Sequence, residues 1–249
     1  MNQYGRFAYI YDELMNDINY KEIVDYIEEI FKNNNLKPEL VLDLACGTGT
    51  ITTELALRGY DMIGVDISPD MLEVAQEKAT ANNLEKTLYL CQDMKEFELY
   101  GTVDAITCMF DSLNYINYYN DIKKIFKLVN NYLNHGGVFI FDMNTIHKLS
   151  KVLGENTFSY ATNNITYIWE NEYNLRKRTC DFYLTFFVKE ESGLYEKFEE
   201  QHTEKGYTIE AIEEALSYAG LKLVNKYKDY SFDEGNRNCE RITYVAIKE

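Results

Sequence analysis

Three acidic residues lie within or directly after short apolar runs in the first hundred residues. Asp43 lies inside the run 40–45, Asp66 ends the next run, and Asp93 follows a third. Such runs between turn signals predict buried strands of a parallel sheet, whose carboxyl ends form one edge where ligands bind. A carboxylate buried without a partner is costly, so we expect Asp43 to serve a ligand rather than to fill the core.

A loop of small residues, Ala-Cys-Gly-Thr-Gly at 45–49, follows the first run and precedes helical periodicity. Gly47 and Gly49 permit positive φ and a close backbone approach, so a ligand can lie against the loop and the following helix N-terminus. Asp66, at the tip of the second strand, is placed to accept both ribose hydroxyls of a nucleoside. The dinucleotide fingerprint fits less well, because Thr52 stands where it requires Gly or Ala. A purely structural glycine turn is the other reading.

With its apolar strand, acid and glycine loop, the segment 43–49 resembles the first motif of the class I S-adenosylmethionine-dependent methyltransferases. The resemblance covers nearly the whole chain and is strongest over 40–144. It implies S-adenosylmethionine as cofactor and S-adenosylhomocysteine as product. The chain departs from the motif at Ala45, where many members carry glycine. Since alanine is nearly as small, we expect little consequence.

The resemblance also implies roles for residues along the strand ends. Asp43, Asp66 and Asp93 would hold the amino-acid, ribose and adenine ends of the cofactor, and Asp43 acts directly or through water. The aromatic N-terminal stretch would close over the sulfonium, which is attracted to aromatic faces; its alternative is a packing helix. The expected cofactor-binding residues are Tyr4, Tyr11, Asp43, Ala45, Gly47, Gly49, Asp66, Ile67, Asp93, Met94, Met109 and Phe110.

The loop after the fourth predicted strand, 111–115, would face the transferable methyl group. Asp111 and Asn114 are therefore candidate catalytic or substrate-positioning residues, and His202 is the candidate general base. The loop is not of the Asn-Pro-Pro-Tyr type seen in many amino methylases of DNA, RNA and protein. No metal site is expected, because the cysteines have no paired spacing.

The expected fold is α/β: a doubly wound, mostly parallel seven-stranded sheet of the Rossmann-like methyltransferase type, with a small antiparallel β insertion. We expect an N-terminal lid and cofactor-binding core over 1–149, a three-stranded substrate lid over 150–206, and completion of the core sheet by a terminal hairpin over 207–249. Aromatic residues of the insertion either line a pocket or form a core: Tyr167, Trp169, Tyr183 and Phe186.

The composition limits the classes of molecule that the protein is expected to bind. The formal net charge is -16, with 41 acids against 25 bases, which disfavours binding to phosphate backbones, so no nucleic-acid partner is expected. Neither a signal segment nor a membrane span is evident, and the lone cysteines suit a reducing cytoplasm. The expected activity is methyl transfer to a small molecule. A tRNA- or protein-modifying methyltransferase and a non-catalytic cofactor-binding module are alternatives; the acceptor and the oligomeric state stay open.

Overall fold

A seven-stranded sheet forms the centre of the protein in the computed structural model, which describes residues 3–249, with side chains from residue 7 onward. Its strand order is β10-β11-β5-β4-β1-β2-β3. Only β11 runs antiparallel to its neighbours, as expected for a terminal hairpin. The strands are β1 (Leu40–Leu44), β2 (Asp61–Asp66), β3 (Thr87–Cys91), β4 (Val103–Cys108), β5 (Leu133–Asn144), β10 (Leu221–Lys228) and β11 (Arg241–Lys248).

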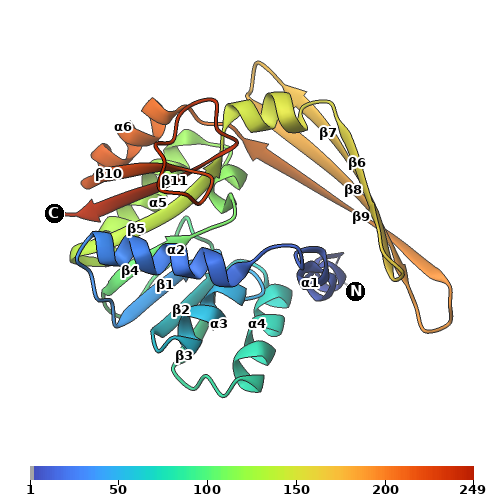
Figure 1. Ribbon diagram of the computed structural model, residues 1–249, viewed down its shortest axis with the longest axis horizontal. Coiled ribbons are helices and arrows are strands. Elements are labelled where there is room, and N and C mark those ends of the chain that lie inside the picture. Colours follow the sequence, from blue (N-terminus) through green and yellow to red (C-terminus); the bar gives the residue numbers. More distant parts are fainter. Residues whose placement is uncertain (1–2) are drawn as a thin grey trace.

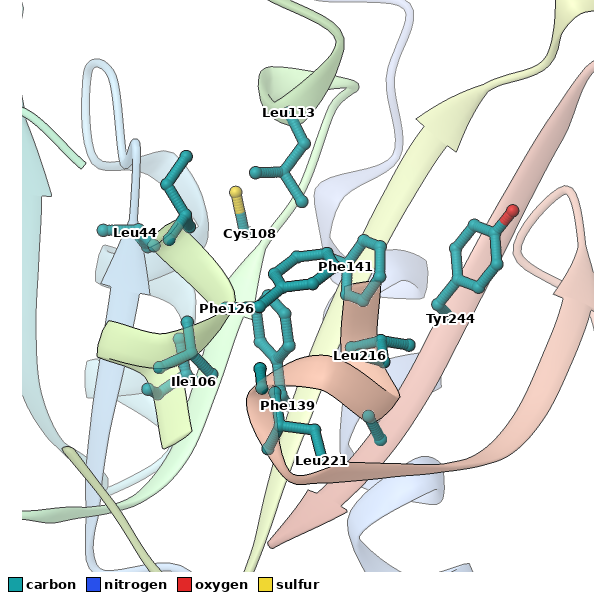
Figure 2. Close-up of a cluster of buried hydrophobic side chains, with 14 of the residues drawn as sticks. Leu44, Ile106, Cys108, Leu113, Phe126, Phe139, Phe141, Leu216, Leu221 and Tyr244 are labelled. Carbon is teal, nitrogen blue, oxygen red and sulfur yellow. The ribbon is translucent and has the colours of Figure 1, made fainter. Parts of the chain in front are cut away.

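Helices cover both faces of this sheet. On one face, α2 (Tyr20–Asn33) and α3 (Thr50–Leu57) pack apolar side chains against the central strands, and α4 (Pro69–Ala81) lies beside α3. On the other, α5 (Tyr119–Tyr132) and α6 (Ile209–Ala219) do the same. Figure 2 shows this second core, where Phe126 packs against Phe139 and Phe141. The doubly wound α/β fold is thereby confirmed.

Local sequence signals fix where two of these helices begin. Ser68 caps α4 by accepting the backbone N–H of Met71, and Thr208 caps α6 by accepting that of Ala211. The α4 cap stands directly after β2, so the chain leaves the sheet in a tight turn at Asp66. This turn keeps the Asp66 carboxylate at the edge formed by the carboxyl ends of the parallel strands.

The insertion is an antiparallel sheet of four strands, not three. Its order is β6-β7-β8-β9, with β6 (Thr157–Ala161), β7 (Ile165–Asn174), β8 (Thr179–Lys189) and β9 (Tyr195–Lys205). The unexpected strand is β6, an edge strand whose five residues are all exposed and which pairs only with β7. A short exposed edge strand leaves little apolar pattern to read.

The two faces of the insertion differ. Directly opposed residues share a face, so the register defines an inner face that carries Tyr167, Trp169, Phe182, Leu184, Phe186, Phe198, Glu200 and His202. Tyr183 was expected to share one pocket or core with Tyr167, Trp169 and Phe186, but it lies on the outer face, because side chains alternate along a strand. Figure 1 shows the insertion projecting from the core, with α1 (Gln3–Leu14) in the angle between the two sheets. Among the described helices, none is long and apolar enough to cross a membrane.

Candidate functional site

The glycine loop after β1 and the turn after β2 meet at the Asp66 carboxylate. One carboxylate oxygen accepts the backbone N–H of Gly47 and the other accepts that of Ser68, both at 2.9 Å. Parallel pairing of β1 with β2 brings these segments together. Burial raises the pKa of Asp66, and the two N–H groups oppose that rise. The structure thus places Asp66 against the glycine loop, at the end of β2.

This edge has the shape and chemistry that a nucleoside needs. A Cβ built on Gly47, at φ +55°, meets no atom within 4 Å, so there is open space beside the loop. Ile67, next to the Asp66 acceptor, is 66% exposed and offers an apolar surface to a ring. Gly49 has a different reason to be glycine, because its Cβ would come 2.6 Å from the Tyr89 hydroxyl. The residues present therefore fit S-adenosylmethionine.

Asp43 has partners inside the protein. It is 3% exposed and accepts hydrogen bonds from the hydroxyls of Thr52, at 2.6 Å, and Thr107, at 2.9 Å. Burial raises its pKa to about 6, even though both hydroxyls favour the ionised form. Asp43 thus ties β1 to α3 and β4, and its burial requires no ligand. Thr52, the residue that breaks the dinucleotide fingerprint, is one of its partners.

Asp93 lies in the turn after β3, at the same edge. Its carboxylate accepts the backbone N–H of Lys95 at 2.8 Å and forms an ion pair with the Lys95 ammonium at 3.1 Å. The backbone N–H of Gln92 donates to the Asp66 carbonyl at 2.9 Å, so the turns after β2 and β3 are adjacent. Met94, in the same turn, packs against the core. The three acids predicted as cofactor ligands end neighbouring or nearby strands.

The loop after β4 is strained and is held by a buried acid. Phe110 and Asp111 have φ of 57° and 52°, although neither is glycine. A left-handed residue of this kind costs about 1–2 kcal/mol. Their backbone N–H groups both donate to the Asp142 carboxylate, at 2.8 and 2.7 Å. Asp142 therefore stabilises a backbone shape that the chain would otherwise avoid.

Arg241 completes this cluster from the start of β11. Its guanidinium forms ion pairs with Asp111 and Asp142, and the Tyr230 hydroxyl donates to Asp142 at 2.8 Å. Burial raises the pKa of Asp111, but the charges of Arg241 and Lys148, together with side-chain hydrogen bonds, outweigh it and hold that pKa below its usual value. Asp111 is accordingly an ionised partner of Arg241, which makes it a support for the loop.

Asn114 joins the loop to the insertion. Its amide nitrogen donates to the backbone carbonyls of Asn144, at 3.0 Å, and Lys205, at 2.9 Å, and its oxygen accepts the backbone N–H of Asn144. These bonds connect η1 (Ser112–Tyr115) to β5 and β9. The side chain is fully buried, so it fixes where the antiparallel sheet leaves the core.

The N-terminal helix α1 is attached to the cofactor edge. Asp12 accepts a hydrogen bond from Thr48 at 2.7 Å and pairs with Lys78 at 2.6 Å. Tyr11, the residue before Asp12, is half-buried, and desolvation, with further contributions from Tyr20 and Asp111 among others, raises the pKa of its hydroxyl. The side chain of Tyr4 lies outside the described residues.

His202 is the point where three distant segments meet. Its ring lies 5.9 Å from that of Phe7 on α1 and 5.8 Å from that of Tyr115 on η1. Burial lowers the pKa of His202, which favours the neutral imidazole that a general base requires. Asp111 and Asn114 lie in the segment that carries Tyr115, so the three candidate catalytic residues belong to one neighbourhood.

Two cavities are lined by residues of the loop after β4, α1 and α3. One, of about 440 Å³, is lined by Phe110, Tyr230 and Arg241 together with the start of α2, and the other, of about 250 Å³, by Asp12, Thr50 and Lys78 among others. The carbonyl of Met109, the residue before Phe110, accepts one hydrogen bond from the Ser112 hydroxyl at 2.8 Å. Of the two cofactor-binding residues predicted directly after β4, Phe110 therefore lines the cavity of about 440 Å³.

Several supporting residues were not predicted from the sequence. Asp142 could have been found, because it nearly ends a parallel strand as the other acids do. Arg241 begins an antiparallel strand and so reaches the same edge. Glu204, whose carboxylate accepts a hydrogen bond from Asn144 at 2.8 Å, carried no signal in the sequence. Its partner comes from a strand 60 residues away.

Comparison with known proteins identifies the class. Residues 41–137 match the Methyltransferase domain family. The chain is 33% identical, over 98% of its length and 97% of the other, to YqeM of Bacillus subtilis (strain 168), a protein assigned as a methyltransferase. The crystal structure of an S-adenosylmethionine-dependent methyltransferase from Clostridium acetobutylicum ATCC 824 has 40% identity and a TM-score of 0.90, with 99% of each chain covered. The chain belongs to the class I S-adenosylmethionine-dependent methyltransferases, and its cofactor is S-adenosylmethionine.

A more distant structure shares the fold. S-adenosylmethionine-bound CalS10 from Micromonospora echinaspora, an amino pentose methyltransferase, is 17% identical with a TM-score of 0.76, over 97% of this chain and 96% of that one. The insertion lies within the matched length, so it belongs to the shared architecture.

Proposed function

We propose that this methyltransferase acts on a small-molecule acceptor, which binds between α1, η1 and the inner face of the antiparallel sheet. The observation that carries the proposal is the ring contact of His202 with both Phe7 and Tyr115. These residues surround a spot beside the strained loop after β4 with aromatic groups. A water-poor aromatic enclosure suits a small acceptor, whereas a polymer needs an open groove, and a nucleic acid needs a basic one.

The cofactor would lie along the edge from Phe110 to Asp93. In this proposal Asp66 accepts the ribose hydroxyls, Asp93 and Met94 meet the adenine, Ile67 packs on its face, and the backbone of Met109 and Phe110 contacts the amino-acid end. The chemistry that S-adenosylmethionine supplies is an electrophilic methyl group. Tyr11, fixed over the edge through Asp12 and Thr48, excludes water from it. Asp43, Asp111 and Asn114 position strand and loop.

His202 would accept the proton of the acceptor. A base is needed when the acceptor arrives protonated, as a phenol, ammonium or carboxylic acid does. Because burial lowers its pKa, His202 is neutral at pH 7. Alignment of acceptor and methyl group contributes most of the acceleration, up to about 7–11 kcal/mol in favourable cases. CalS10, whose acceptor is an amino pentose, supports a small acceptor in an enclosure of this architecture.

The test is the distribution of methyl label among pools of acceptors. Purified protein is incubated with methyl-labelled S-adenosylmethionine and, separately, with dialysable metabolites, total tRNA and total protein. Label in the dialysable pool supports the proposal. Label confined to tRNA or protein contradicts it, and no label in any pool favours a non-catalytic binding module. Tyr11→Phe should bind the cofactor but transfer more slowly; wild-type rates would reduce α1 to packing.

A further inference from the structure

Four acidic side chains are buried in the described part of the chain: Asp43, Asp142, Glu200 and Glu204. Three of them accept hydrogen bonds from the protein. Asp43 accepts from threonine hydroxyls, Asp142 from backbone N–H groups and the Tyr230 hydroxyl, and Glu204 from the Asn144 amide. Glu200 differs, because its enclosed Oε1 has no hydrogen-bond partner among the described residues. Burial raises its pKa, with no charged neighbour to offset the effect. A carboxylate so placed is costly unless something else pairs with it.

The position of Glu200 explains its burial. It lies on β9 and is paired in register with Leu184 on β8. The Phe7 ring lies 5.7 Å from Phe186 and 5.9 Å from His202, which flank that pair diagonally. Phe7 therefore covers the Leu184–Glu200 row, and Glu200 is only 7% exposed. The carboxylate is enclosed between the inner face and the helix that is attached to the cofactor edge.

The neighbours of this carboxylate favour a cation. Phe186 stacks on Phe198 with centroids 5.0 Å apart, one residue pair along from Glu200 on the same face. Aromatic faces attract ammonium groups, and a carboxylate supplies the matching charge. His202 is two residues along β9, so its side chain lies about 7 Å from Glu200 on the same face. The negative charge of Glu200 excludes an anion as its ligand and favours a cation. The base, His202, is a separate residue on the same face.

We propose that Glu200 binds the protonated amino group of the methyl acceptor, so that the substrate class is a small amine with an apolar or aromatic body. This rests on the proposed function. The bound ammonium loses one proton to His202. The nitrogen lone pair then forms the new N–C bond as the methyl C–S bond breaks, and the electron pair of that bond stays on sulfur. The products are a methylated ammonium and S-adenosylhomocysteine.

The binding test uses matched probes and matched variants. Benzylammonium chloride and benzyl alcohol share a ring and differ in charge; each is titrated by calorimetry into protein saturated with S-adenosylhomocysteine, which prevents turnover. The variant is Glu200→Gln, which keeps the shape and removes the charge. The control is Glu199→Gln, the adjacent outer-face residue, which is exposed and paired with Lys197.

The expected result has three parts. Wild type and Glu199→Gln bind benzylammonium at least tenfold more tightly than benzyl alcohol, and Glu200→Gln loses that preference. Glu200→Gln also melts at the same or a higher temperature, because an unpaired buried charge is gone, whereas a structural role would lower the melting temperature. Its affinity for S-adenosylmethionine stays within twofold of wild type.

Four results would overturn the inference. Equal binding of the two probes by wild type excludes a cation site. A preference retained in Glu200→Gln assigns the site elsewhere. Weaker binding of S-adenosylmethionine but not of S-adenosylhomocysteine by the variant means that Glu200 faces the sulfonium instead. If dialysable alcohols but no amines are methylated, the proposed function stands, and only the assignment of an amine as the acceptor is wrong.

Discussion

The cofactor edge and the inner face of the antiparallel sheet differ in whether the protein supplies hydrogen-bond donors to their acidic side chains. At the edge, Asp43, Asp66 and Asp93 all have donors from the protein itself. On the inner face, the Glu200 Oε1 has none in the described chain, and the stacked rings of Phe186 and Phe198 form the next residue pair along. The edge is preorganised for one constant ligand, whereas the inner face leaves a charge for the acceptor to neutralise. The two regions meet at the loop after β4, which the Asp111–Arg241–Asp142 cluster supports.

The largest expected effect is at that junction. Arg241→Met removes the guanidinium from the buried Asp142 and the half-buried Asp111, so their charges are left uncompensated and the left-handed loop loses its support. We expect the free energy of unfolding to fall by about 3–5 kcal/mol, measured by denaturant titration. Lys222→Met, which breaks an exposed pair with Glu249, should change it by less than about 1 kcal/mol. Equal effects of the two variants would mean that the cluster does not hold the regions together.

The next effect concerns proton transfer. His202→Gln should lower kcat about 100-fold, or about 2.7 kcal/mol, for an acceptor that binds protonated. Burial lowers the pKa of His202, so the wild-type rate should persist below the usual histidine pKa and fall only once the imidazole is protonated. That acidic limb should vanish in the variant. His135→Gln, at an exposed position, is the control. A rate within twofold of wild type in His202→Gln would remove the residue from the chemistry.

A smaller effect is expected at the cofactor edge. Asp66→Ala should weaken binding of S-adenosylmethionine at least tenfold, or about 1.4 kcal/mol, because the ribose acceptor and the anchor of the Gly47 loop are both lost. Asp61→Ala offers a matched control, since Asp61 begins the same strand at the opposite edge. Calorimetry with both variants decides the matter, and an unchanged dissociation constant for Asp66→Ala would end its ribose role.

The same contrast explains what could be read from the sequence. The strands β1, β2 and β4 are short apolar runs, and an acid or a cap lies at or just after the end of such a run, as at Asp66 and Ser68. Fold class, strand ends and helix starts were therefore predictable. The donors to Asp43 were not, because Thr107 lies 64 residues from it, and chemistry alone indicated that the acid needed a ligand. Pairing across such distances decides whether a polar residue is satisfied or available.

The acceptor region depended still more on distant contacts. Phe7, Tyr115 and His202 come from three separate segments, and only folding shows that their rings meet. The aromatic strands predicted a lid, but one residue of register decides the face, and Tyr183 was placed on the wrong one. Glu200 had no signal in the sequence, because its proposed role depends on the lack of a hydrogen-bond partner, which only the folded structure shows.

The smallest expected effect refines the description of the glycine loop. Ala45 was expected to be harmless because of its size, but its φ is +60°, so conformation is what disfavours alanine there. Ala45→Gly should stabilise the protein by about 1 kcal/mol, which is roughly 2–4 °C in melting temperature for a chain of this length. Two reverse substitutions separate conformation from space. Gly47→Ala should cost about the same amount, because its Cβ meets nothing, whereas Gly49→Ala should cost more, because its Cβ also collides with Tyr89 and Ala75. If the two substitutions cost the same stability, the residues around Gly49 must move to make room for its Cβ. The cofactor edge would then not be preorganised, and it would not differ from the inner face in this respect.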